Sequence, residues 1–151
     1  MDRLILFIAT GFGSGYLPKA PGTWGSLVGV ALWFGLRELA LLPYLGVIAA
    51  IFVVGTLCAG SAEKIIDRAD PGLVVVDEIV GQLLALLAAP HHPVAAVLAF
   101  LAFRFFDILK PFPVGWLDRR IHGGLGIMLD DLVAGLYSLL LLQPVWQFVW
   151  P

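Results

Sequence analysis

Three long stretches of this chain contain no Lys, Arg, Asp or Glu: Leu39–Ala62, Ile79–Phe103 and Leu132–Pro151, which are 24, 25 and 20 residues long. A run of roughly 18 apolar residues is long enough to cross a bilayer as a helix. Composition agrees, because 60% of the 151 residues are hydrophobic and 13% are charged, whereas soluble domains have about 45–50% and about 25%. We therefore expect an integral membrane protein, folded as one all-α helical bundle over residues 1–151.

The middle apolar run is a poor single span, because its centre reads Pro90-His91-His92-Pro93. Proline cannot donate a backbone hydrogen bond, and histidine is polar, so this segment fits a tight turn better than a bilayer centre. The sequence therefore predicts two helices, at about 72–89 and 93–109. Three further spans are predicted: from Thr23 or Ser26 to about Leu42, over Leu45–Ala62, and from Asp131 to about Phe148. Thr23 and Ser26 both fit a helix cap. The total is about five spans.

The basic residues favour the five-span arrangement. With the N-terminus inside, eight of the nine Lys and Arg residues face the cytoplasm and only Arg37 faces out, as the positive-inside rule requires. In a four-span alternative, residues 79–103 cross once, and the basic residues from Arg104 onward move to the opposite face. That alternative weakens the charge bias, so we expect five spans.

Five acidic residues lie in otherwise apolar sequence, and the five-span arrangement brings all of them to the cytoplasmic face. Each costs a few kcal/mol near a membrane helix unless it is compensated. Helix capping or a buried salt bridge explains any one pair, but a metal site explains all of them better. Carboxylate oxygens suit a hard cation such as Mg²⁺. The predicted metal ligands are Asp77, Glu78, Asp107, Asp130 and Asp131.

The same face carries basic residues that suit a phosphate ligand: Lys19, Arg104, Lys110, Arg119 and Arg120. Arg104, Asp107 and Lys110 are spaced i, i+3, i+6, so they share a helix face and can pair. The Gly-rich segment Gly11–Ser26 fits a backbone cradle for an anion, although loop glycines usually only turn the chain. The sequence contains no basic run typical of nucleic-acid binding.

Four motifs resemble the phosphatidylglycerophosphatase A family: GFGSGYLPKAPGTWGS, VVVDEIVGQLLAL, FRFFDILKPFPVGWLDRRIHGG and GIMLDDLVAG. The resemblance extends from Thr10 to about Ser138. It implies a multi-pass, Mg²⁺-dependent enzyme of the bacterial inner membrane. Such a phosphoric monoester hydrolase converts phosphatidylglycerophosphate to phosphatidylglycerol and phosphate in phospholipid biosynthesis. The residues that it implicates are Lys19, Thr23, Asp77, Glu78, Arg104, Asp107, Lys110, Asp130 and Asp131.

From the residues and the resemblance together we expect defined roles. Catalysis is assigned to Asp77, Glu78, Asp107 and Asp131, and substrate binding to Lys19, Thr23, Arg104, Lys110 and Arg119. We expect direct attack by water, with Glu78 favoured over Asp131 as general base. An aspartyl-phosphate intermediate on Asp107 or Asp130 is the alternative.

Two other classes of function stay open at this point. Intramembrane acids often mark transport paths, so the alternative hypothesis is that the chain is an ion or proton carrier. A carrier predicts acids spread through the membrane depth, whereas the outer halves of the predicted spans have none apart from Glu38. A structural membrane subunit needs no cluster of five acids.

Overall fold

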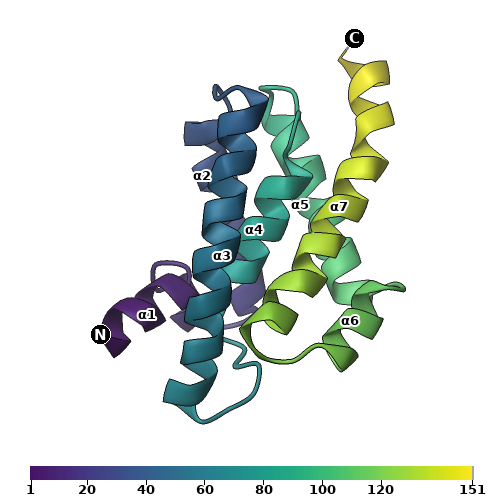
Figure 1. The fold of residues 1–151 in the computed structure, drawn as a ribbon. Helices are drawn as coiled ribbons and strands as arrows, with labels where there is room; N and C mark the ends of the chain where they lie inside the picture. The colour runs from purple at the N-terminus through teal and green to yellow at the C-terminus, as the bar shows by residue number, and fades with distance from the viewer. Residues whose placement is uncertain (151) are drawn as a thin grey trace.

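The computed structural model describes residues 1–150, and within them the regular structure is entirely helical, which confirms the all-α prediction. Five of the helices run side by side as a bundle, with a short helix at the N-terminus and another before the last helix (Figure 1). The elements are α1 Asp2–Ala9, η1 Ser14–Tyr16 (a 3-10 turn), α2 Pro21–Leu36, α3 Leu41–Ile66, α4 Val76–Ala85, α5 Pro93–Leu109, α6 Val114–Arg120 and α7 Gly123–Val149.

Helix α4 lies at the centre of the bundle, where it packs against α7, α2, α3 and α5. Eight of its ten residues are buried. Its contact with α7 requires glycine, because a Cβ atom added at Gly81 would lie 2.6 Å from the carbonyl oxygen of Asp131. A Cβ atom at Gly135 would overlap the carbonyl oxygen of Gly81 in the same way. The two backbones therefore touch, and the second turn of α4 lies beside the third and fourth turns of α7.

The expected helix at 72–89 is wrong in length, because α4 covers only Val76–Ala85 and is about 15 Å long. Before it, the chain turns between Pro71 and Val74, and the N–H of Val75 donates to the carbonyl of Ala9. After it, turns replace the helix, and Ala88 has a φ of 57°. Hydropathy reports only that a segment is apolar, and here the apolar residues form a buried core helix.

Three helix starts also differ from the predicted ones. Helix α2 begins at Pro21, which suits a first helical position; Ser26 lies inside the helix and its hydroxyl donates to the carbonyl of Gly22. Helix α3 begins at Leu41, with Pro43 in the first turn, where proline is tolerated. Helix α7 begins at Gly123, so Asp130 and Asp131 lie within the helix and do not cap it.

The turn at Pro90–Pro93 is confirmed. It ends with His92 as the N-cap of α5, whose Nδ1 accepts a hydrogen bond from the N–H of Val94. His91 lies 3.3 Å from Glu38, so this turn and the α2–α3 connection are at the same end of the bundle. The opposite end carries the starts of α2, α4 and α7, the ends of α3 and α5, and α6 (Figure 1).

Helices α3 and α7 are, among the described residues, long and apolar enough to cross a membrane, judged by length and composition. Much of the apolar surface of α3 faces outward; Val53 and Leu57, for example, are 59% and 68% exposed. Exposed apolar surface of this kind is expensive in water and favourable in lipid.

Candidate active site

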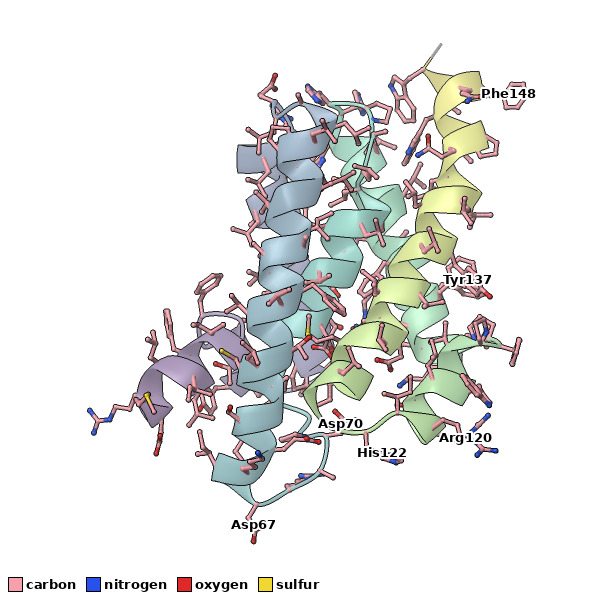
Figure 2. The ribbon with its side chains drawn as sticks, viewed as in Figure 1. Asp67, Asp70, Arg120, His122, Tyr137 and Phe148 are labelled. Atoms are coloured by element: carbon pink, nitrogen blue, oxygen red, sulfur yellow. The ribbon has the colours of Figure 1, made fainter. Side chains whose placement is uncertain are left out.

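A cavity of about 220 Å³ opens at the end of the bundle where α4 and α7 begin. Figure 2 shows Asp70 and His122, both of which line it, at this end, with Phe148 at the far end of α7. All five acids predicted as metal ligands line this cavity: Asp77, Glu78, Asp107, Asp130 and Asp131. They come from α4, α5 and α7, so the fold brings together acids that the sequence placed on one face.

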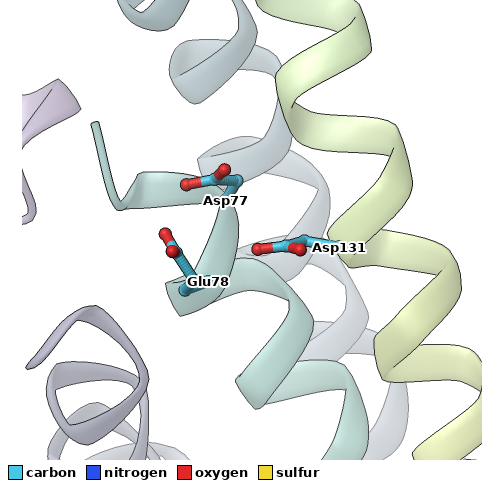
Figure 3. A group of neighbouring side chains, drawn as sticks. All are labelled: Asp77, Glu78 and Asp131. Carbon is cyan, nitrogen blue, oxygen red and sulfur yellow. The ribbon is translucent and has the colours of Figure 1, made fainter. Parts of the chain in front are cut away.

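Three of these carboxylates lie close together in the cavity. Asp77 and Glu78 from α4 face Asp131 from α7 (Figure 3), and ligand oxygens of the three lie within 4.8 Å of one another. Asp77 is 9% exposed and Asp131 is 3% exposed. Asp77 Oδ1 and Glu78 Oε2 are buried and accept no hydrogen bond from the described residues. Carboxylates at this spacing repel one another, and their burial also removes hydrating water. A hard divalent cation coordinated by their oxygens would compensate the repulsion and the lost hydration.

Glu78 also lies against the start of α2. A Cβ atom added at Gly22 would overlap Glu78 Oε1 and lie 2.9 Å from Arg104 Nη1. The unpaired N–H groups and the dipole at a helix N-terminus favour a negative charge. Glycine at this position therefore lets the Glu78 carboxylate approach the end of α2.

Arg104 pairs with Asp107 one turn further along α5, as their spacing predicted. The two side chains are 16% and 13% exposed, so the pair is largely withdrawn from solvent. Arg104 Nη1 and Glu78 Oε1 both lie close to the Cβ position of Gly22, so this guanidinium is near the Glu78 carboxylate.

Lys110 does not pair with Asp107, in contrast to the i, i+6 prediction. Helix α5 ends at Leu109, and Lys110 takes a φ of 45°, so the helical spacing no longer applies to it. Its Nζ lies 2.9 Å from Asp118 and 2.9 Å from Asp130. Burial alone lowers the pKa of Lys110, but the hydrogen bonds to Asp130 and Asp118 outweigh it and raise the pKa above its usual value. Lys110 therefore stays charged and joins α6 to α7.

Four of the five predicted substrate-binding residues do not line the cavity: Lys19, Thr23, Arg104 and Arg119. Lys19 and Arg119 are exposed, and Thr23 is half-buried in the first turn of α2, next to Gly22. The glycine-rich loop has a packing role, because a Cβ atom at Gly15 would overlap the carbonyl of Leu73. These glycines let the N-terminal segment pack against the chain that leads into α4.

Four polar residues that sequence reasoning did not select also line the cavity: Glu63, Asp70, Asp118 and His122. Asp118 and His122 fall within the third family-like motif, which is the signal that points to them. Glu63 and Asp70 lie in the charged segment between residues 63 and 70, outside the family-like motifs, so no sequence signal points to them. They join the site because the chain turns after α3, where the N–H of Asp70 donates to Glu63.

Comparison with known proteins gives one consistent family. A family model described as Phosphatidylglycerophosphatase A matches residues 7–146. Phosphatidylglycerophosphatase A of Escherichia coli is 39% identical over 132 residues, covering 87% of this chain and 77% of that protein. The protein of the same name from Haemophilus influenzae is 41% identical over 140 residues, covering 90% and 85%. A Bacteroides thetaiotaomicron protein named as a candidate phosphatidylinositol-3-phosphatase is 40% identical over 146 residues, covering 92% and 91%. No solved structure matches. The chain therefore belongs to the phosphatidylglycerophosphatase A family of phosphatases.

Proposed function

We propose that this protein hydrolyses the terminal phosphate monoester of phosphatidylglycerophosphate, which gives phosphatidylglycerol and inorganic phosphate for phospholipid biosynthesis. The observation that carries the proposal is the group of three carboxylates, Asp77, Glu78 and Asp131, which lie largely withdrawn from solvent and line an open cavity. Family membership supports the reaction and the lipid substrate.

The proposed cofactor is Mg²⁺, and the donor set supports it. Asp77, Glu78 and Asp131 offer oxygens within 4.8 Å of one another, and Asp107 and Asp130 lie in the same cavity. Oxygen-only sites of this kind suit Mg²⁺, which keeps several water ligands. When bound, the ion supplies positive charge that stabilises the charge developing on the phosphoryl oxygens.

The chain's own residues then bind and orient the substrate. Arg104, close to Glu78, donates to phosphate oxygens, and Lys110 adds a fixed positive charge at the cavity wall. Glu78, with one oxygen that accepts no hydrogen bond, removes a proton from the attacking water. Phosphoryl transfer depends mainly on positioning and charge stabilisation, which these groups provide. Lys19, Thr23 and Arg119 lie outside the cavity lining and are proposed to contact the rest of the headgroup.

We propose that the bundle sits in the bacterial inner membrane and that the cavity faces the cytoplasm. Eight of the nine basic residues belong to segments at the cavity end, and Arg37 lies at the other end. Helices α2, α3, α5 and α7 would form the walls, and α4, too short to face lipid over a full bilayer, would pass through their centre. This charge asymmetry is the one that membrane insertion uses to orient a protein.

The distribution of acids disfavours a carrier. Glu38 lies at the end of the bundle away from the cavity, beside His91, while the five predicted metal-binding acids line one cavity. A transport path needs polar groups through the membrane depth. A binding site for a headgroup at the membrane surface needs them at one end only.

The proposed function is tested with purified protein in detergent micelles, by measuring phosphate released from phosphatidylglycerophosphate with Mg²⁺ and with a chelator. Parallel reactions contain glycerol 3-phosphate, and phosphatidylinositol 3-phosphate because of the Bacteroides relative. We expect Mg²⁺-dependent release from phosphatidylglycerophosphate, little from glycerol 3-phosphate, and none from an Asp131→Asn variant. Asp67→Asn, at an exposed acid outside the cavity, is the matched control and should keep full activity. Release from the phosphoinositide alone would contradict the substrate, and chelator-resistant release would contradict the cofactor.

A further inference from the structure

The side-chain amide of Gln82 is buried in the middle of the bundle without a hydrogen-bond partner. Gln82 is 0% exposed, and neither its Oε1 nor its Nε2 contacts a donor or acceptor among the described residues. An amide in this state costs roughly 2–7 kcal/mol relative to water. Leu or Met fills a similar volume without that cost, so packing alone does not explain glutamine here.

Gln82 lies one helical turn after Glu78 on α4, and residues spaced i, i+4 are neighbours on a helix surface. Both side chains face α2. Glu78 Oε1 is next to Gly22, and a Cβ atom at Gly29 would lie 2.8 Å from Gln82 Cβ. Glu78 Oε2, like the amide of Gln82, is buried and has no partner. An unused donor and an unused acceptor thus lie one turn apart on the same face.

The neighbouring polar groups offer Gln82 no free carboxylate besides Glu78. The hydroxyl of Ser26 donates to the carbonyl of Gly22 within α2. Arg104 forms an ion pair with Asp107, and its Nε and Nη1, which have no hydrogen-bond partner, are donors and cannot accept from the amide. The glycines at positions 22 and 29 present no side chain that competes for the amide. Glu78 is therefore the acidic acceptor best placed for Gln82.

We propose that Gln82 is a positioning residue whose Nε2–H donates to Glu78 Oε2 in the working site. This hydrogen bond fixes the orientation of the Glu78 carboxylate toward Asp77 and Asp131. A carboxylate held in one orientation loses less freedom when it binds a cation, and outer groups of this kind commonly raise metal affinity. The inference rests on the proposed function, in which Glu78 binds metal and removes the proton from water.

The test is Gln82→Met, which keeps the side-chain length and removes the amide. Without metal, we expect an unfolding temperature equal to or above that of the wild type, because a buried unpaired amide is lost. We expect kcat to fall about tenfold with KM for the lipid little changed, and several-fold more Mg²⁺ to be needed for half-maximal activity. Mn²⁺ binding, followed by electron paramagnetic resonance without substrate, should weaken several-fold.

Gln143→Met is the matched control. Gln143 lies on α7 toward the other end of the bundle, and its Nε2 donates to the carbonyl of Leu87 at 3.4 Å. This variant should keep the wild-type kcat and Mn²⁺ affinity.

Two results would overturn the positioning role: wild-type kcat and Mn²⁺ affinity in Gln82→Met, or a lowered unfolding temperature with unchanged Mn²⁺ affinity. The second result would show a purely structural glutamine. If the wild type releases no phosphate from phosphatidylglycerophosphate, the proposed function fails, and the Mn²⁺ comparison still decides the role of Gln82.

Discussion

Asp77 and Asp131 come from different helices, yet both carboxylates are almost fully buried and close enough to share one ion. Asp77→Asn keeps the size and removes one of the like charges. We expect activity to fall by about 100-fold or more, because a metal ligand and charge are lost. In the metal-free protein the same change should raise the free energy of unfolding by about 1 kcal/mol, because repulsion and desolvation are relieved. Phosphate release and thermal unfolding in chelator measure the two effects, and a variant with full activity would remove Asp77 from the site.

Lys110 illustrates a charged residue whose role is to join helices. Lys110→Met leaves Asp118 and Asp130 without their shared cation, so we expect a loss of about 1–3 kcal/mol in unfolding free energy. The pKa of Lys110 is raised in the folded protein. The stabilisation by Lys110 is therefore complete below its pKa in the unfolded chain, and it declines as the pH rises through its pKa in the folded protein. The stability difference should therefore be constant between about pH 6 and pH 9. Lys64→Met, at an exposed lysine of α3, is the control; an equal loss there would argue against the bridge.

At the scale of elements, the start of α2 can lie against α4 because Gly22 has no side chain. Gly22→Ala places a methyl group on the Glu78 carboxylate and beside Arg104, so we expect a loss of activity of about tenfold or more. Gly35→Ala, in the same helix with open space around its Cβ position, should keep activity and gain about 0.5–1 kcal/mol from helix propensity. Phosphate release and thermal unfolding of the two variants give the comparison. Equal activities would show that Glu78 does not depend on this contact.

The elements also show what the sequence predicts and what it does not. The start of α5 was predictable because Pro90–Pro93 interrupts an apolar run at one place. The extent of α4 was not, because Val75, the residue before it, is held by a hydrogen bond to Ala9, far away in sequence. The acids of the site were predictable from their apolar surroundings. Glu63 and Asp70 were not, since a charged turn on the surface and one at the rim of a cavity have the same composition.

At the scale of the whole molecule, the orientation in the membrane is measurable with single cysteines. Cys58 is the one cysteine of the chain, so Cys58→Ser gives a background without thiols. In that background we expect His91→Cys to react in intact cells with a thiol reagent that cannot cross the inner membrane. Arg120→Cys, on exposed α6 at the cavity end, should react only after the membrane is permeabilised. The reverse pattern would place the cavity outside.

The enclosure of α4 has a consequence for how such a protein is synthesised. This helix packs most extensively against α7, which is translated after it, and its Asp77 lies close to Asp131 of that helix. A ten-residue segment with two acids and a glutamine is too short and too polar to be released into lipid by itself. During translation, α4 therefore contacts α2 and α3 before α7 is available to complete the bundle. The active site is therefore assembled only when α7 joins the bundle, and chains that terminate before α7 lack it.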